Sequence, residues 1–415
     1  MSRIRRCLAA LRGKGCRHGL AVLFLAVVLW VAAAALPAGV AGLGAAMRAG
    51  EPGGSLDVRS AAKTFDAAYR EMLDFSGPLP VNRGAYIDLN GLMARLMGQR
   101  FVNDCVKLNN GHLAGFGGHA DIPESWPHLV ALCRRQEAAG KTFLFVLAPG
   151  QVSPYEPLEP VGYTNYYNGA GDAMLSALRK NRVPVLDLRA EMHAAGIRHA
   201  EAFFVADLHW KPETGLWAFI RILDELARMG AVAPVDPMYT DAGNYQTEVY
   251  ERWFLGSSGR RTGRYFAGVD DFSVITPRFD THLAVEIPTR GLQSEGVYAQ
   301  TALDWRRLQS KDSYTEDPYE MYGHGNTDLV RYRNRQAPLD QRVLWLDDSF
   351  GNVVTPYFSL VFKEVEDLDM RYYRGDFARL YDAFQPDVVV VLVNATGTLQ
   401  ENTTHDFFPD GQTAR

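Results

Sequence analysis

A serine placed between an expected strand and an expected helix is the first residue whose type and position could do chemistry. The apolar run Arg342–Leu346 leads into Asp347-Asp348-Ser349-Phe350, and a helix is expected around residues 355–365. Ligands of open α/β sheets bind beyond the carboxyl ends of the strands. We therefore expect Ser349 to be exposed beside backbone N–H groups that could receive an oxyanion. A helix N-cap is the plainer interpretation of the same serine.

The second element is Asp207-Leu208-His209-Trp210, which directly precedes the helical pattern of residues 211–229. A carboxylate can orient an imidazole and stabilise its cation while the ring takes the proton of a serine. Taken alone, the pair also fits a helix cap with a surface histidine beside it. Its place at a second expected strand-to-helix junction of the same sheet favours the functional interpretation. Asp207, His209 and Ser349 are thus predicted to form one site.

Four short motifs in a fixed order resemble the SGNH hydrolase-like family of alginate O-acetylation proteins. They are Asp207–Trp210, Gly256–Gly263, Asp270–Phe272 and Asp348–Phe350. The resemblance covers roughly residues 60–400. Ordinary SGNH hydrolases place the serine first, whereas in the acetylation family, as here, the Asp-His pair precedes it. The resemblance implies that Ser349 is the nucleophile, His209 the general base and Asp207 the residue that orients it.

The resemblance also implies a function, namely O-acetylation of an exported polysaccharide through an acyl-enzyme, without a cofactor. The acetyl group would come from a membrane-bound O-acyltransferase partner. Two departures stand out: Asp347 replaces the usual glycine before Asp-Ser, and no clear block supplies the family's oxyanion donors. The candidates for oxyanion donors are Gly351, Asn326 and Asn394, and each is also a common type of turn or strand-end residue.

Several further side chains could contact a sugar. Arg260 and Arg261 could clamp an anionic group, although a solvated loop is the plainer interpretation. Trp210 and Tyr322 could stack on a sugar ring, although such aromatic residues more often fill a core. Asn326 completes the candidate substrate-binding set. No metal site is expected, because the histidines of the Gly-rich loop near residue 112 lack metal-ligand spacing.

The elements that must position these residues alternate between strands and helices. Continuous apolar runs such as Thr142–Ala148 and Asp387–Val393 suit parallel strands that are covered on both faces. We therefore expect a three-layer α/β/α domain of SGNH type with a parallel central sheet over residues 86–400. Residues 239–335 lack the alternation and are predicted to form an inserted cap. A stalk helix or linker (48–85) precedes the domain, and a polar tail (401–415) follows it.

The N-terminus is predicted to enter a membrane. Residues 1–18 contain six Lys or Arg and no Asp or Glu, and residues 19–47 carry no charge. The length of the apolar run favours an uncleaved anchor, and a cleavable signal peptide is the alternative. Either places the body outside the cytoplasm. We expect a single-pass protein of a bacterial inner membrane with its catalytic domain in the periplasm, where Cys105 and Cys133 could be bridged or remain separate thiols.

Composition excludes several classes of protein. With 47% hydrophobic and 22% charged residues, the chain has enough apolar surface to fold. Its net charge is −5, and the basic N-terminus leaves a more acidic body, which argues against a nucleic-acid partner. Besides the transferase, two hypotheses remain. They are a periplasmic carbohydrate acetylesterase and a non-catalytic scaffold or binding subunit of a polysaccharide export complex.

Overall fold

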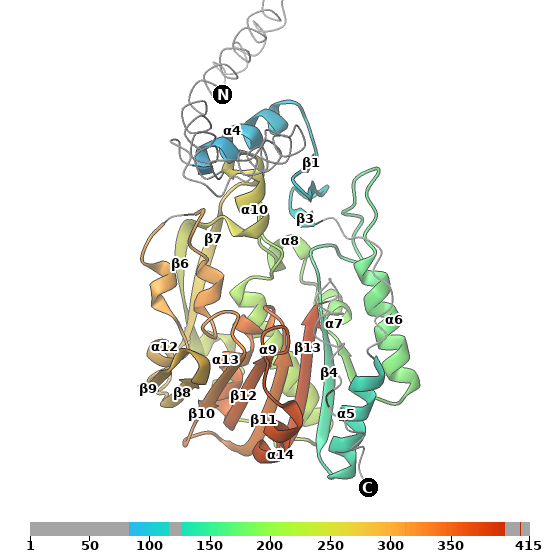
Figure 1. Cartoon of the computed structure of the whole chain (residues 1–415), viewed down its shortest axis with the longest axis vertical. Coiled ribbons are helices and arrows are strands. Elements are labelled where there is room, and N and C mark those ends of the chain that lie inside the picture. The colour runs from blue at the N-terminus through green and yellow to red at the C-terminus, as the bar shows by residue number, and fades with distance from the viewer. Residues whose placement is uncertain (1–82, 116–125, 312, 395–406, 408–415) are drawn as a thin grey trace, which may run out of the picture. The chain divides into compact units, whose positions relative to one another are not determined.

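The computed structural model describes residues 83–115, 126–311, 313–394 and 407. The chain divides into two compact units, Met1–Tyr86 and Ile87–Arg415, and the fold below is that of the second (Figure 1). The expected membrane segment, nearly all of the expected stalk and almost all of the expected tail lie outside the described residues. Within the residues that are described, no helix combines the length and the apolar character needed to cross a membrane.

An eight-stranded sheet forms the centre of the second unit, in the order β5-β4-β13-β11-β12-β10-β8-β9. The first five strands are parallel: β5 (Val185–Asp187), β4 (Thr142–Ala148), β13 (Val388–Asn394), β11 (Leu339–Asp347) and β12 (Phe362–Asp369). The last three pair antiparallel: β10 (Leu329–Arg333), β8 (Leu283–Ile287) and β9 (Leu292–Gly296).

The prediction of a parallel sheet is thus right for five strands and wrong for the other three. Those three come from residues 239–335, so part of the segment expected to be a cap instead extends the sheet. The connection from β8 to β9 contains only the short helix η3 (Pro288–Arg290) and Gly291, which has φ +59°. So short a connection can join only antiparallel neighbours.

Helices cover both faces of the parallel half of the sheet, as expected for three layers (Figure 1). Alternate residues of each strand enter opposite cores. Phe143, Phe145 and Leu147 contact one core, whereas Leu144 and Val146 contact the other. The first core includes α5 (Trp126–Ala138), α6 (Tyr167–Lys180) and α14 (Phe377–Phe384). The second includes α7 (Leu188–Ala194), α9 (Pro212–Arg228) and α13 (Thr355–Val361).

Smaller elements complete the described part of the chain. Before β4 lie α4 (Arg83–Leu96) and a small sheet of β1 (Phe101–Val102), β2 (Cys105–Lys107) and β3 (Leu113–Gly115), whose last two strands pair antiparallel as a hairpin. The inserted segment adds the ribbon of β6 (Tyr245–Phe254) and β7 (Asp270–Pro277), and the helices α10 (Gly256–Thr262), α11 (Arg264–Ala267) and α12 (Tyr298–Thr301). The single turns within this segment are η2 (Ala242–Asn244), η4 (Trp305–Leu308) and η5 (Pro318–Met321). Three more lie elsewhere in the chain or at the start of the segment: α8 (His199–Ala202), η1 (Pro237–Tyr239) and η6 (Gly351–Val353).

The two cysteines of the body are not bridged. Cys105 lies on β2 and Cys133 on α5, and both are buried free thiols. Burial raises the pKa of Cys105, and it raises the pKa of Cys133 to about 12. Of the two alternatives left open by the sequence, the structure therefore has separate structural thiols.

Candidate active site

Ser349 lies in a tight turn at the carboxyl end of β11, directly before η6. The Asp348 carboxylate shapes this turn. Its Oδ1 accepts the N–H of Phe350 at 2.9 Å, and its Oδ2 accepts the N–H of Asn394 at 2.9 Å. Because Asn394 ends the neighbouring strand β13, the turn is fastened to the adjacent strand of the sheet. Ser349 is only 9% exposed, so the expectation of an exposed serine is wrong.

The Asp207–His209 segment approaches Ser349 from a loop between α8 and α9. The expectation that a strand of the main sheet precedes this segment is wrong, since only an isolated bridge joins Phe203 and Trp210. Side chains hold the loop instead. Asp270 accepts the N–H groups of Val205 at 3.0 Å and Ala206 at 2.9 Å.

Gln151, in the loop after β4, fastens the same segment from another side. Its Nε2 donates to the carbonyl oxygen of Phe204 at 2.8 Å and to that of Asp207. The loop that carries the Asp-x-His pair is therefore fastened through its backbone to Asp270 at the start of β7 and to Gln151 at the carboxyl edge of the sheet.

The three predicted residues form one continuous hydrogen-bonded path. Ser349 Oγ lies 2.7 Å from Nε2 of His209, and Nδ1 of His209 lies 2.5 Å from Oδ1 of Asp207. These contacts fit the tautomer in which Nδ1–H donates to Asp207 and Nε2 accepts the hydroxyl proton of Ser349. The expected approach of Ser349 to His209 and of His209 to Asp207 is thus present across 140 residues of sequence.

The Asp207 carboxylate remains ionised although it is buried. Burial by itself raises the pKa of Asp207, but the charge and hydrogen bonds of His209 outweigh it, and the N–H of Ser257 adds to them. Together they lower the pKa to about 2. Ser257 donates to Oδ2 of Asp207 at 2.6 Å from the first turn of α10. A charged carboxylate at this place can orient the imidazole and stabilise its cation, so the geometry supports acyl transfer by a nucleophilic serine.

Comparison with known families bears on the same segment. Residues 112–244, which include Asp207 and His209, match the family described as the SGNH hydrolase-like domain of the acetyltransferase AlgX. The resemblance to the AlgX family is thereby confirmed. No curated protein sequence matches the chain.

Solved structures show the same fold at low sequence identity. Bacillus cereus PatB1 with a sulfonyl adduct is 15% identical, with a TM-score of 0.58 over 73% of this chain and 98% of that one. A DHHW family protein from Eubacterium siraeum is 18% identical, with a TM-score of 0.54 over 73% of this chain and 95% of that one. The TM-scores show a shared architecture, and the family match supports an SGNH-like α/β fold.

Two aromatic residues predicted to contact a sugar are instead structural. Trp210 is completely buried, and its Nε1 donates to the carbonyl oxygen of Phe350 at 3.0 Å. Tyr322 is also completely buried, and its hydroxyl accepts the N–H of Ile275 at 2.7 Å and donates to the carbonyl oxygen of Ser273 at 3.1 Å. Neither ring presents a face to solvent, so the prediction that they stack on a sugar is wrong.

The polar candidates for substrate binding have different surroundings. Arg260 pairs with Asp317 at 2.5 Å and is not a free anion clamp. Arg261 is exposed, and its Nε donates to the carbonyl oxygen of Ser257 in the preceding turn of α10 at 3.3 Å. The main chain of Asn326 accepts from Arg290 at 2.9 Å. A role for Arg261 or Asn326 in substrate binding stays a prediction.

Two of the three candidate oxyanion donors, Gly351 and Asn394, are engaged elsewhere. The N–H of Gly351 donates to the carbonyl oxygen of Asp348 at 2.8 Å. Asn394 donates its N–H to Asp348 and its Nδ2 to the carbonyl oxygen of Pro149 at 2.6 Å. The assignment of Gly351 as an oxyanion donor is therefore wrong, and Asn394 is a buried link between the nucleophile turn and the loop after β4.

Asn352 is the residue that sequence reasoning missed. It lies three residues after Ser349 in η6 and is 9% exposed, and its Nδ2 has no hydrogen-bond partner among the described residues. A buried amide donor without an acceptor is costly unless a ligand supplies one. The oxyanion of a tetrahedral intermediate is such an acceptor. The nearness of Asn352 to Ser349 was the only available sequence signal.

The aspartate that replaces the family's glycine belongs to a buried acidic group beside the nucleophile turn. Asp347 Oδ2 accepts Trp345 Nε1 at 2.9 Å and Thr355 Oγ1 at 3.1 Å. Burial raises the pKa of Asp347 well above its usual range, and the nearby carboxylates of Asp367 and Asp369 raise it further. The raised pKa values mean that the cluster of Asp347, Asp367 and Asp369 holds protons above the usual range of a carboxyl group. The cluster lies beneath the nucleophile turn and takes no part in the hydrogen-bonded path from Asp207 to Ser349.

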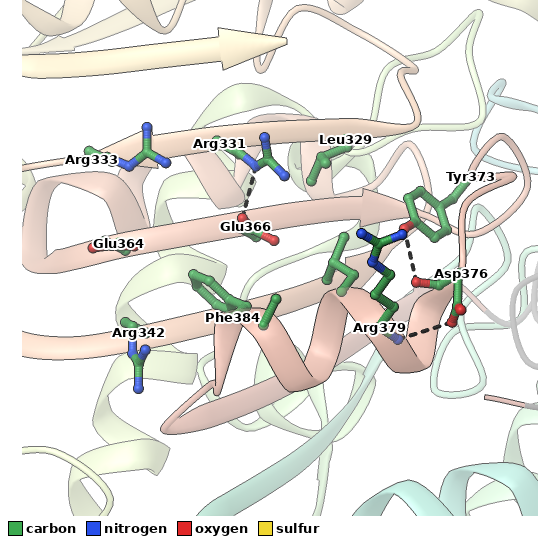
Figure 2. A pocket seen from close by; sticks show the side chains of 12 residues that line it. Leu329, Arg331, Arg333, Arg342, Glu364, Glu366, Tyr373, Asp376, Arg379 and Phe384 are labelled. Atoms are coloured by element: carbon green, nitrogen blue, oxygen red, sulfur yellow. Dashed lines mark hydrogen bonds and ion pairs between the residues drawn. The ribbon is translucent and has the colours of Figure 1, made fainter. Parts of the chain in front are cut away.

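A separate hollow of about 600 Å³ lies between strands β10, β11 and β12 and helix α14 (Figure 2). Arg331, Arg333, Arg342 and Arg379 line it together with Glu364, Glu366 and Asp376. Arg331 already pairs with Glu366 at 2.9 Å. Since the hollow contains no residue of the Asp207–His209–Ser349 path, it does not define the candidate active site.

Proposed function

We propose that this protein is an O-acetyltransferase that moves an acetyl group onto a hydroxyl of an exported polysaccharide through an acyl-enzyme at Ser349. The observation that carries the proposal is the continuous path from Asp207 through His209 to Ser349. The match to the AlgX acetyltransferase family supports acetyl as the transferred group. A polysaccharide as acceptor is part of the proposal and rests on the same family relationship.

Two half-reactions follow from the positions of the three side chains. In the first, Ser349 Oγ attacks the carbonyl carbon of the donor's acetyl group while Nε2 of His209 takes the hydroxyl proton. The bond to the donor oxygen then breaks, and that oxygen leaves with the proton from His209. In the second, a sugar hydroxyl gives its proton to Nε2 and attacks the acetyl-serine carbonyl, and Ser349 recovers the proton as it leaves.

Location and partners belong to the same proposal. An anchor at residues 19–47 would hold the domain beside a membrane-bound O-acyltransferase that supplies acetyl groups. The domain would then work in the bacterial periplasm on a polymer during its export. The esterase alternative uses the same triad, with water in place of the sugar hydroxyl, so the acceptor decides between the two reactions.

The test uses the full-length chain with a chromogenic acetyl ester. Wild-type protein should release the chromophore, and Ser349→Ala should lose nearly all of this activity. A sulfonyl fluoride should modify Ser349 in the wild-type protein and leave the Ser349→Ala variant unmodified, as read by mass spectrometry. If the wild-type protein releases no chromophore, or if the sulfonyl fluoride labels another residue, Ser349 is not the nucleophile.

Polysaccharide acceptors then separate the reactions. Acetylated polymer, detected by NMR, is expected from a transferase. Free acetate with an unchanged polymer would assign the esterase activity instead. A well-folded protein that yields neither product with any ester would point to the scaffold role.

A further inference from the structure

Helix α10 lies directly against the acid of the triad. The N–H of Ser257 donates to Asp207 Oδ2 at 2.6 Å, and the N–H of Gly259 donates to the carbonyl oxygen of Ala206 at 2.8 Å. Gly256 has φ +67°, and a Cβ at this position would lie 2.5 Å from the Cβ of Asp207. Only a residue without a Cβ lets α10 approach Asp207 this closely.

The turn η5 lies against the base of the triad. The ring of Tyr319 stacks on the ring of His209, with centroids 4.2 Å apart and planes inclined by 21°. Phe350 makes a second ring contact with His209 at 5.1 Å. Tyr319 is 2% exposed, and its hydroxyl has no hydrogen-bond partner within the described residues. The tyrosine therefore acts on His209 through its ring face, which also favours the imidazolium that forms during acyl transfer.

One ion pair joins these two supports. Arg260 on α10 donates from its terminal nitrogen to Asp317 Oδ2 at 2.5 Å. The other oxygen of Asp317 accepts the N–H of Tyr319 at 3.2 Å and so caps η5. The side chains of Arg260 and Asp317 are 25% and 21% exposed. The same pair thus connects the helix that holds Asp207 to the ring that holds His209.

We propose that the Arg260–Asp317 pair is a positioning brace for the triad, which keeps α10 on Asp207 and the Tyr319 ring on His209. The inference rests on the proposed acyl transfer at Ser349. Neither Arg260 nor Asp317 touches Ser349 in the described contacts, so both are positioning residues. Displacing a catalytic group by about 1 Å can cost on the order of 100-fold in rate, whereas a partly exposed ion pair contributes little to stability.

The variants are chosen to remove the pair without removing its surroundings. Arg260→Ala removes the cation, and Asp317→Asn keeps an oxygen that can cap Tyr319 but removes the charge. Each should lower kcat for the chromogenic ester by about ten- to 100-fold with KM nearly unchanged. The double variant should be no slower than the slower single variant, because both changes break the same interaction. Arg260→Lys should restore part of kcat.

Controls separate positioning from folding. Arg228→Ala removes an exposed arginine that pairs with the half-buried Glu225 on α9, and it should leave kcat at the wild-type value. The thermal midpoints of all brace variants should stay within about 3 °C of wild type. Tyr319→Phe, which keeps the ring, should retain more of kcat than Tyr319→Leu.

The outcomes distinguish this inference from the proposed function. If Ser349→Ala is inactive and Arg260→Ala and Asp317→Asn keep wild-type kcat, the brace is wrong while acyl transfer stands. Additive losses in the double variant would likewise overturn the brace, since they would show independent roles. If Ser349→Ala keeps full activity, the proposed function fails whatever the brace variants do.

Discussion

Oδ1 of Asp207 lies 2.5 Å from Nδ1 of His209 and also accepts the backbone N–H of His209 at 2.9 Å. A carboxylate two residues before a histidine therefore binds both its ring and its main chain. This local arrangement orients the imidazole without any contribution from Ser349. It also makes Asp207 responsible for the tautomer that leaves Nε2 free to accept a proton.

Asp207→Asn should lower kcat on the order of 10⁴-fold while the fold persists, because an amide neither stabilises the imidazolium nor fixes the tautomer. Steady-state kinetics on the chromogenic ester at neutral pH measure the loss. Asp340→Asn, at an exposed carboxylate paired with Lys363, is the matched control and should behave as wild type. A loss smaller than about ten-fold would show that Asp207 has no such role.

Asn352→Ala should lower kcat by about 100- to 1,000-fold if its Nδ2 is a donor to the oxyanion. The expected signature is a fall in kcat with KM little changed, since the interaction forms only as charge develops on the carbonyl oxygen. The rate at which a sulfonyl fluoride labels Ser349 gives a second measurement on the same variant. Wild-type kcat in Asn352→Ala would instead make Asn352 a structural residue of η6.

Gly351 is a test of packing under the nucleophile turn. A Cβ at this residue would lie 1.4 Å from Oδ2 of Asp347, so Gly351→Ala forces the buried carboxylate or the turn to move. Thermal unfolding should show a loss of about 1–3 kcal/mol, together with reduced activity. Gly169→Ala is the control: this exposed helical position has no atom within 4 Å of the added Cβ, and the change should stabilise by up to about 1 kcal/mol.

The buried acids beside the turn should make stability depend on pH. Burial raises the pKa of Asp367, and the nearby Asp369 raises it further. The folded state thus holds a proton that the unfolded chain releases above pH of about 4. Stability should fall as the pH rises from about 4 through the raised pKa, by up to about 1.4 kcal/mol per pH unit for one proton.

Asp367→Asn tests this sign, because an amide mimics the neutral acid. Its thermal midpoint should fall less than that of the wild type between pH 5 and pH 8. An equal fall in both proteins would assign the pH dependence to other groups.

Elements with strong patterns, and the residues that meet at Ser349, could be predicted from the amino-acid sequence. Continuous apolar runs located β4, β11 and β13, and helical spacing located α9, because strand and helix periods follow from the backbone alone. The types of Asp207, His209 and Ser349, together with their order in the resembling family, were enough to predict their contact. The strand expected before Asp207 is absent, so the meeting of strand ends explains only the place of Ser349. Asp207-x-His209 also carries its own local geometry, which needs no distant partner.

Tertiary structure alone decided which groups support that site. The N–H of Ser257 reaches Asp207 across 50 residues, and Asp317 reaches Arg260 across 57. Any residue other than proline has a backbone N–H, so the sequence does not indicate which of them binds Asp207. Nor does the sequence indicate whether an arginine forms an ion pair. Trp210 and Tyr322 were expected to contact a sugar, but both are buried in the core, and their burial depends on the tertiary structure. The antiparallel strands β8 to β10 were missed because each is only five residues long. Their pairing with one another, and that of β10 with β12, defines them.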